Sequence, residues 1–122
     1  MTENKPFDIN SRSFEFAVTV LDASDLIPSG RIGNRIADQL IRSSTSIGAN
    51  LEEATGASSK PDFINKVIIA LKEARETNYW LRLSQRKRLI PIELLNPLLA
   101  ESEEIKKILG SIATKARKNS KR

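Results

Sequence analysis

The sequence predicts an all-α protein, an antiparallel up-down-up-down four-helix bundle. Apolar residues recur at intervals of three and four in four separate segments, and no segment shows the alternation typical of a half-buried β-strand. The connections between these segments are short, which favours antiparallel packing of helices that follow one another in the chain. The chain has 122 residues, which is enough for one domain and few for two.

The first helix is expected over residues 11–26. Ser11 is a suitable N-cap because its hydroxyl can accept a hydrogen bond from a free backbone N–H group of the first turn. The sequence Pro28-Ser29-Gly30 ends the helix. Residues spaced i, i+3, i+4 and i+7 form the expected buried face. They are Phe14, Ala17, Val18 and Leu21.

The second helix is expected over residues 33–54, with Asp38 and Arg42 paired on its outer side. Its expected buried face consists of Ile36, Leu40, Ser43, Ile47, Asn50 or Leu51, and Ala54. Residues 43–50 are mostly Ser, Thr, Gly and Ala, whose small side chains allow a neighbouring helix to approach closely. A tight helix crossing is therefore the favoured interpretation. The alternative is a glycine-rich phosphate loop, but no Lys-Ser or Lys-Thr pair follows Gly48, as a P-loop requires.

The third helix is expected after the break at residues 56–61 and extends to about residue 83. Ser59 fits the N-cap and Pro61 fits the first turn. Its expected buried face consists of Phe63, Val67, Ala70, Leu71, Ala74, Asn78 and Leu81. Tyr79 and Trp80 are the only Tyr and Trp of the chain. We expect both to be packing anchors, and a platform for stacking bases is the alternative.

The fourth helix is expected to open or kink at Asn96-Pro97, because proline has no N–H to donate. Its apolar stripe consists of Leu98, Ile105 and Ile112, widened by Leu99, Ile108 and Leu109. The chain is polar and basic beyond Ala116, where the helix is expected to fray. The domain organisation expected from these segments is an N-terminal extension (1–10), a bundle (11–114) and a basic C-terminal tail (115–122).

The composition excludes several classes of enzyme. Leu, Ile, Val and Phe make up about 28% of the chain, enough for a packed core. The chain has no Cys and no His, so it has no disulfide, no thiol nucleophile, no imidazole base and no thiolate or imidazole metal site. No apolar run is long enough for a membrane span, and the polar N-terminus is not a secretory signal. We expect a cytoplasmic, non-catalytic protein without a cofactor.

Carboxylates are the remaining candidates for catalysis. Glu52 and Glu53 lie on the second expected helix, and Glu73 and Glu76 lie on the third. A site for Mg²⁺ or Mn²⁺ made only of carboxylates is chemically possible. However, Lys72 and Arg75 are close enough in sequence to neutralise Glu73 and Glu76. We therefore expect these acids to form salt bridges at helix or subunit contacts.

The positive charge is concentrated in two segments. The chain has 20 Lys and Arg against 15 Asp and Glu, a net charge of +5. Residues 1–114 are neutral, so the excess belongs to the tail. Basic clusters bind phosphate groups by counterion release, without reading sequence. The candidate nucleic-acid-binding residues are Arg82, Arg86, Lys87, Arg88, Lys115, Arg117, Lys118, Lys121 and Arg122. The alternative is a solubilising tail and a helix end where cations suit the helix dipole.

The central part of the chain resembles a known family. Residues 42–57 (RSSTSIGANLEEATGA) and 63–83 (FINKVIIALKEARETNYWLRL) are similar to the bacterial 23S rRNA intervening-sequence protein family, whose members are also called four helix bundle proteins. The opening SFEFA (13–17) and the turn LIP (89–91) resemble it too. The resemblance extends over about residues 7–114.

The resemblance implies an up-down four-helix bundle that assembles into a homopentamer, without catalytic residues. The family is similar to the accessory proteins of diversity-generating retroelements, which are basic pentameric barrels that bind nucleic acid and a reverse transcriptase. Apolar surface on the second helix and at Ile64, Ile68 and Leu71 agrees with a subunit contact. The expected function is non-specific binding of RNA or DNA by this oligomer. The alternative is a protein-interaction scaffold or accessory subunit for a nucleic-acid enzyme, without nucleic-acid contact of its own.

Overall fold

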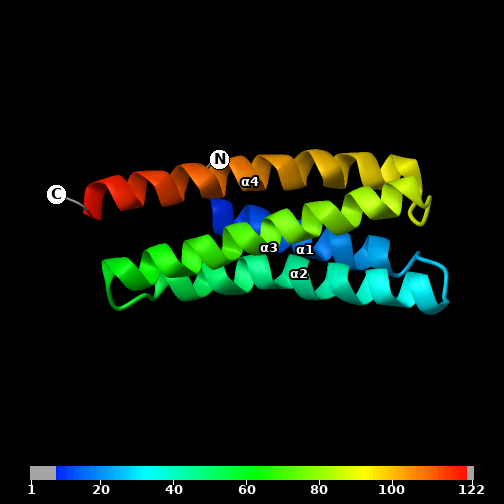
Figure 1. Cartoon of the computed structure of the whole chain (residues 1–122), viewed down its shortest axis with the longest axis horizontal. Coiled ribbons are helices and arrows are strands. Elements are labelled where there is room, and N and C mark those ends of the chain that lie inside the picture. Colours follow the sequence, from blue (N-terminus) through cyan, green and yellow to red (C-terminus); the bar gives the residue numbers. More distant parts are fainter. Residues whose placement is uncertain (1–7, 121–122) are drawn as a thin grey trace.

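A computed structural model describes residues 8–120 of the chain and forms four helices from them (Figure 1). These are α1 (Ile9–Ser24), α2 (Arg31–Thr55), α3 (Lys60–Arg86) and α4 (Ile92–Ser120). No strand occurs between residues 8 and 120. The predicted all-α class and the four helices are confirmed.

Each helix packs against two others, consistent with a four-helix bundle. The contacts are α1 with α2, α2 with α3, α3 with α4, and α4 with α1, so α1 and α3 occupy opposite corners. Figure 1 shows that α3 begins at the end of the molecule where α2 and α4 finish. The α1–α2 and α3–α4 connections lie together at the other end.

Two helix starts depend on side-chain caps. At α1 the Asp8 carboxylate accepts a hydrogen bond from the backbone N–H of Ser11 at 3.2 Å. The predicted Ser11 N-cap is therefore wrong, because the helix begins two residues earlier and the donor itself is Ser11. At α3 the predicted cap is confirmed, since the Ser59 hydroxyl accepts from the N–H of Asp62 at 3.2 Å.

The buried face of α1 differs from the predicted one. The residues buried there are Ile9, Ser13, Phe16, Val20, Ala23 and Ser24. Of the predicted stripe, Phe14 is 65% exposed and Val18 and Leu21 are more than a third exposed. The helix carries two apolar stripes of equal helical period, and only packing against α2 and α4 decides which one is covered.

The small side chains of α2 do allow close helix packing, as predicted. A Cβ atom added at Gly48 would lie 3.9 Å from the Ser13 Cβ of α1. On the α3 side, Ser43 is fully buried and accepts a hydrogen bond from the Thr77 hydroxyl at 2.9 Å. Leu51 rather than Asn50 belongs to the buried face. The small stripe is thus used inside the subunit and is not surplus apolar surface.

The fourth helix is longer than predicted at both ends. It begins at Ile92, passes through Pro97 and continues to Ser120. The expected fraying after Ala116 is not seen up to Ser120, since residues 117–120 remain helical. Ala113 and Ala116 are buried against the bundle. The helix therefore crosses the expected boundary between bundle and tail at residues 114 and 115. No helix among residues 8–120 is long and apolar enough to cross a membrane.

Candidate nucleic-acid interface

The structure separates the predicted basic residues into two groups. Arg82 and Arg86 lie in the last turns of α3, and Lys87 and Arg88 follow in the turn to α4. Lys115, Arg117 and Lys118 are exposed near the end of α4, at the opposite end of the molecule (Figure 1). A helix rises 1.5 Å per residue, so the two groups are about 35 Å apart. Lys121 and Arg122 lie outside the described residues.

The first group continues as a basic strip along α3, which was not predicted from the sequence. The α3 strip consists of Lys72, Arg75, Tyr79, Arg82 and Arg86, all exposed. Their spacing of three and four residues places them on one side of the helix. Among residues 8–120, none of its four cations forms an ion pair. The helical spacing of Lys72, Arg75 and Arg82 was the available signal.

Tyr79 is the exposed aromatic residue of this strip. Its side chain is 47% exposed, so the predicted role as a packing anchor is wrong for Tyr79. The prediction is confirmed for Trp80, which packs against the core. The two rings meet edge to face, with centroids 5.2 Å apart. The guanidinium of Arg82 lies over the Tyr79 ring, 5.7 Å from its centroid, in cation–π geometry.

A buried amide fixes the position of Arg82. The Arg82 Nε donates to the Asn78 Oδ1 at 2.9 Å. Asn78 is only 2% exposed, and its Nδ2 donates to the Ser102 hydroxyl at 2.8 Å and to a Glu103 carboxylate oxygen at 3.0 Å on α4. Because Asn78 is held by the α3–α4 contact, the guanidinium is oriented by the bundle itself.

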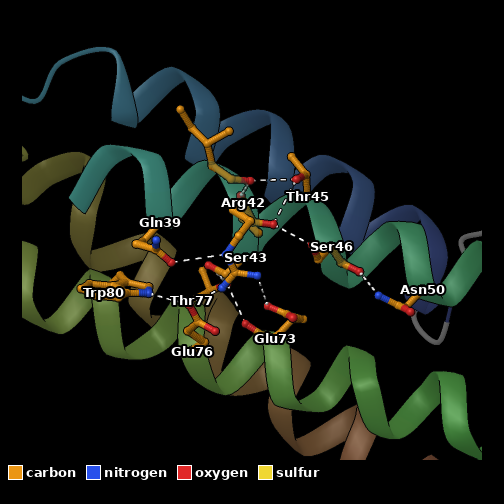
Figure 2. A network of polar contacts seen from close by, with 12 residues as sticks. Gln39, Arg42, Ser43, Thr45, Ser46, Asn50, Glu73, Glu76, Thr77 and Trp80 are labelled. Carbon is orange, nitrogen blue, oxygen red and sulfur yellow. Dashed lines mark hydrogen bonds and ion pairs between the residues drawn. The ribbon is translucent and has the colours of Figure 1, made fainter. Parts of the chain in front are cut away.

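The side of α3 next to this strip is fixed by a network with α2 (Figure 2). Arg42 of α2 pairs with Glu73 and Glu76 of α3, and Glu76 also accepts from the Trp80 Nε1 at 3.0 Å. The expected salt bridges of Glu73 and Glu76 at a helix contact are confirmed. Their partner is Arg42, not Lys72 or Arg75, so the strip keeps its positive charge. The predicted pairing of Arg42 with Asp38 is wrong, because Arg42 extends towards α3.

Electrostatics within this network stabilise the charged forms. Hydrogen bonds from Arg42 and then from Trp80 lower the pKa of Glu76 below its ordinary value, and the charge of Arg42 adds to this effect. The hydrogen bond to Glu76 raises the pKa of Arg42. The charged groups of this network pair with one another, so we assign the network a role in holding α2 against α3.

The turn after α3 holds a cation in an unusual backbone conformation. The N–H of Leu89 bonds to the carbonyl of Ser84, and the N–H of Arg88 bonds to that of Gln85, which is a Schellman motif. Arg88 occupies the left-handed position with φ of 57°. Glycine is the usual residue there because a Cβ is strained in this conformation. Arg88 therefore places a basic side chain at a backbone position where glycine would be less strained.

The described residues contain no cluster of three or more Asp, Glu, His or Cys side chains that could hold a metal ion. Glu53 pairs with Lys66 at 2.8 Å across the α2–α3 contact, and Glu52 accepts from Asn10 of α1. Of the four carboxylates considered from the sequence, Glu53, Glu73 and Glu76 form the expected salt bridges at the α2–α3 contact. Glu52 has a hydrogen bond with α1 in place of a salt bridge within residues 8–120.

Comparisons with known proteins agree with the sequence resemblance. The family model described as 23S rRNA-intervening sequence protein matches residues 5–111. A crystal structure from Bacteroides thetaiotaomicron, of a protein with unknown function from the S23 ribosomal protein family, is 42% identical in sequence. The similarity covers 86% of this chain and 97% of that chain, with a TM-score of 0.76. No curated protein sequence matches the chain.

Proposed function

The chain belongs to the 23S rRNA-intervening sequence protein family, and we propose that it is a non-catalytic homo-oligomer that binds RNA or DNA without reading base sequence. The subunit is an up-down-up-down bundle that acts in the cytoplasm. Its nucleic-acid contact is the α3 strip together with Lys87 and Arg88 of the following turn. The cations of the α4 end form a second, separate contact.

The observation that carries this proposal is the Tyr79–Arg82 pair on an unneutralised basic strip. Sequence-independent binding of single strands combines a positive surface, which follows the phosphates, with an aromatic side chain on which a base can stack. The α3 strip has both, and Asn78 holds Arg82 in place before any ligand binds. Side chains that are already ordered lose less conformational entropy on binding.

The test is the salt dependence of binding to a single-stranded RNA of about 20 nucleotides. Each phosphate neutralised on a single strand contributes about −0.7 to the slope of log K against log salt concentration. A variant with Gln at positions 72, 75, 82 and 86 should lose up to about three units of slope per bound subunit. Fluorescence anisotropy with a labelled RNA measures both the affinity and the slope.

The control replaces Lys115, Arg117 and Lys118 with Gln. Substitution is better than truncation, because Ala116 packs in the core. We expect this variant to lose less RNA affinity than the α3 variant, because the α4 cations have no exposed aromatic side chain beside them within residues 8–120. Equal salt slopes for the wild type and the α3 variant would contradict the proposal, and RNA binding that is absent at low salt would do the same.

The proposed subunit contact is a second apolar surface, the α1–α2 strip. It consists of Phe14, Val18, Leu21 and Ile41, each more than a third exposed. Ile41 shares one side of α2 with Gly48, which meets α1. An exposed apolar strip of this kind is typical of an interface between subunits. The pentamer is the assembly that the family resemblance implies. Ile64, Ile68 and Leu71, which were expected at the subunit contact from the sequence, are half-buried within the subunit.

Light scattering after size exclusion tests this assembly. The wild type should have a mass near five subunits, and Phe14→Ser with Val18→Ser should reduce it. Both side chains are exposed, so the helical circular dichroism signal should remain. A matched variant, Ile32→Ser with Ile92→Ser, changes exposed apolar residues outside the strip and should keep the mass. A monomeric wild type would contradict the proposed assembly.

A further inference from the structure

A groove of about 700 Å³ lies between α1 and the first part of α4. Its lining is largely apolar and includes Phe16, Ala23, Leu94, Pro97 and Leu98. The lining residues that belong to α1 extend from Ser11 to Ala23, which corresponds to about 18 Å of helix. Asp8 before α1 and Leu26 after it line the two ends of the groove. The groove is therefore long enough for a helix of about three turns.

The rim of the groove is acidic. Five carboxylates line it, from Asp8, Glu15, Asp22, Glu93 and Glu101, against one cation. That cation, Arg12, is neutralised by Glu101 through two hydrogen bonds of 2.7 and 2.9 Å. Three of the carboxylates, Glu15, Asp22 and Glu93, are exposed and have no ion pair within residues 8–120.

Pro97 adds a polar feature to the same rim. Proline has no N–H, so the carbonyl of Glu93 lacks its ordinary helical donor four residues later. Both residues line the groove. The start of α4 therefore presents a backbone acceptor beside the Glu93 carboxylate, and both groups favour a donor with positive charge.

The α1 wall of the acidic groove and the basic α3 strip belong to opposite corners of the bundle. Residues 8–25 carry four carboxylates and one cation, and residues 60–88 carry eight cations and three carboxylates. The helices α1 and α3 make no contact with each other. Phosphate groups are repelled by the groove, so nucleic acid bound at α3 leaves it open to a ligand of the opposite charge.

We propose that the α1–α4 groove binds a basic amphipathic helix of a partner protein. The apolar face of such a helix covers Leu94, Pro97 and Leu98, and Lys or Arg side chains on its two flanks meet the acidic rim. Helix-in-groove binding commonly uses apolar anchors at i, i+3, i+4 and i+7. Charge complementarity at the rim then selects basic helices over acidic ones.

The probe is a synthetic helical peptide of about 18 residues, made of Leu on one face and Lys on the flanks, and labelled with fluorescein. Anisotropy titrations measure its affinity for the full chain. The variant Glu15→Lys, Asp22→Lys, Glu93→Lys should bind the peptide about ten-fold or more weakly. The variant Leu94→Ser, which leaves every charge in place, should also bind it more weakly. These residues are exposed, and circular dichroism checks that the helices are retained.

The matched control is Asp38→Lys, Glu52→Lys, Glu104→Lys, which changes the net charge equally at exposed positions outside the groove. It should keep most of the affinity. Equal losses in both triple variants would overturn the proposal, because they would indicate general attraction to an acidic protein. Equal binding of a peptide with Glu in place of Lys would overturn it too. A fall in the protein's own oligomeric mass on adding peptide would assign the groove to a second copy of the chain and reject a partner protein.

Discussion

The Arg82 guanidinium lies over the ring of Tyr79 at 5.7 Å from its centroid, on the open side of α3. Replacing Tyr79 with Leu removes the ring and keeps the charge. Stacking on an aromatic side chain contributes about 1–3 kcal/mol per base, so RNA affinity should fall about five-fold or more, with the salt slope unchanged. The variant Tyr79→Phe should bind like the wild type. Anisotropy at several salt concentrations separates these results, and a changed slope would indicate an indirect effect.

Arg88 allows stability and binding to be changed in opposite directions. Glycine tolerates the left-handed conformation at this position, so Arg88→Gly should raise the free energy of unfolding by about 0.5–1 kcal/mol. The same change removes a cation from the proposed interface and should weaken RNA binding. Denaturant unfolding and anisotropy measure the two effects. Unchanged binding with higher stability would remove Arg88 from the interface.

Replacing either of two buried serines with alanine should change the free energy of unfolding, in opposite directions at the two positions. The Ser13 hydroxyl is buried between helices and has no hydrogen-bond partner among residues 8–120, so Ser13→Ala should stabilise the fold by about 1 kcal/mol. Ser43→Ala removes one of the two partners of the buried Thr77 hydroxyl, which keeps the Glu73 carbonyl as an acceptor, and should cost about 0.5–1 kcal/mol. Urea unfolding followed by circular dichroism measures both, and stabilisation by Ser43→Ala would contradict the role of this hydrogen bond.

Replacing two helical glycines with alanine should also change the stability in opposite directions. A Cβ at Gly33 would lie 2.1 Å from the carbonyl oxygen of Pro28, so Gly33→Ala must displace the backbone before α2 and should cost about 2 kcal/mol or more. Gly110 in α4 has open space around its Cβ position. Gly110→Ala should stabilise the helix by about 0.5–1 kcal/mol. Thermal unfolding midpoints should therefore move in opposite directions, and equal shifts would contradict the packing at Gly33.

Acid should weaken the α2–α3 contact. The pKa of Glu76 is lower in the folded chain than its ordinary value of 4.5, so its contribution to stability is complete above that value and is lost as pH falls below it. The pair is partly exposed, so the contribution is roughly 0.5 kcal/mol. Glu76→Gln should flatten the pH dependence of unfolding below the ordinary pKa of 4.5. An unchanged pH profile in this variant would assign the effect to other carboxylates.

The helical spacing in the sequence determined the fold class, the number of helices and most of the buried residues of α2 and α3. In both helices most residues of the predicted apolar stripe are buried, although Ile41 of α2 is apolar and exposed. The Ser59 cap could also be predicted, because its donor and acceptor are only three residues apart in the sequence. The basic residues at the α3–α4 turn were also visible in the sequence.

The tertiary structure alone decided which stripe of α1 is buried, because Phe14 and Phe16 belong to stripes of equal period and only the neighbouring helices distinguish them. It also decided that Arg42 neutralises Glu73 and Glu76, which leaves Lys72 and Arg75 unpaired within the described chain. Long charged side chains reach across helices, so their partners depend on packing rather than on sequence distance. For the same reason, the separation of the two basic groups and the acidic α1–α4 groove became visible only in three dimensions.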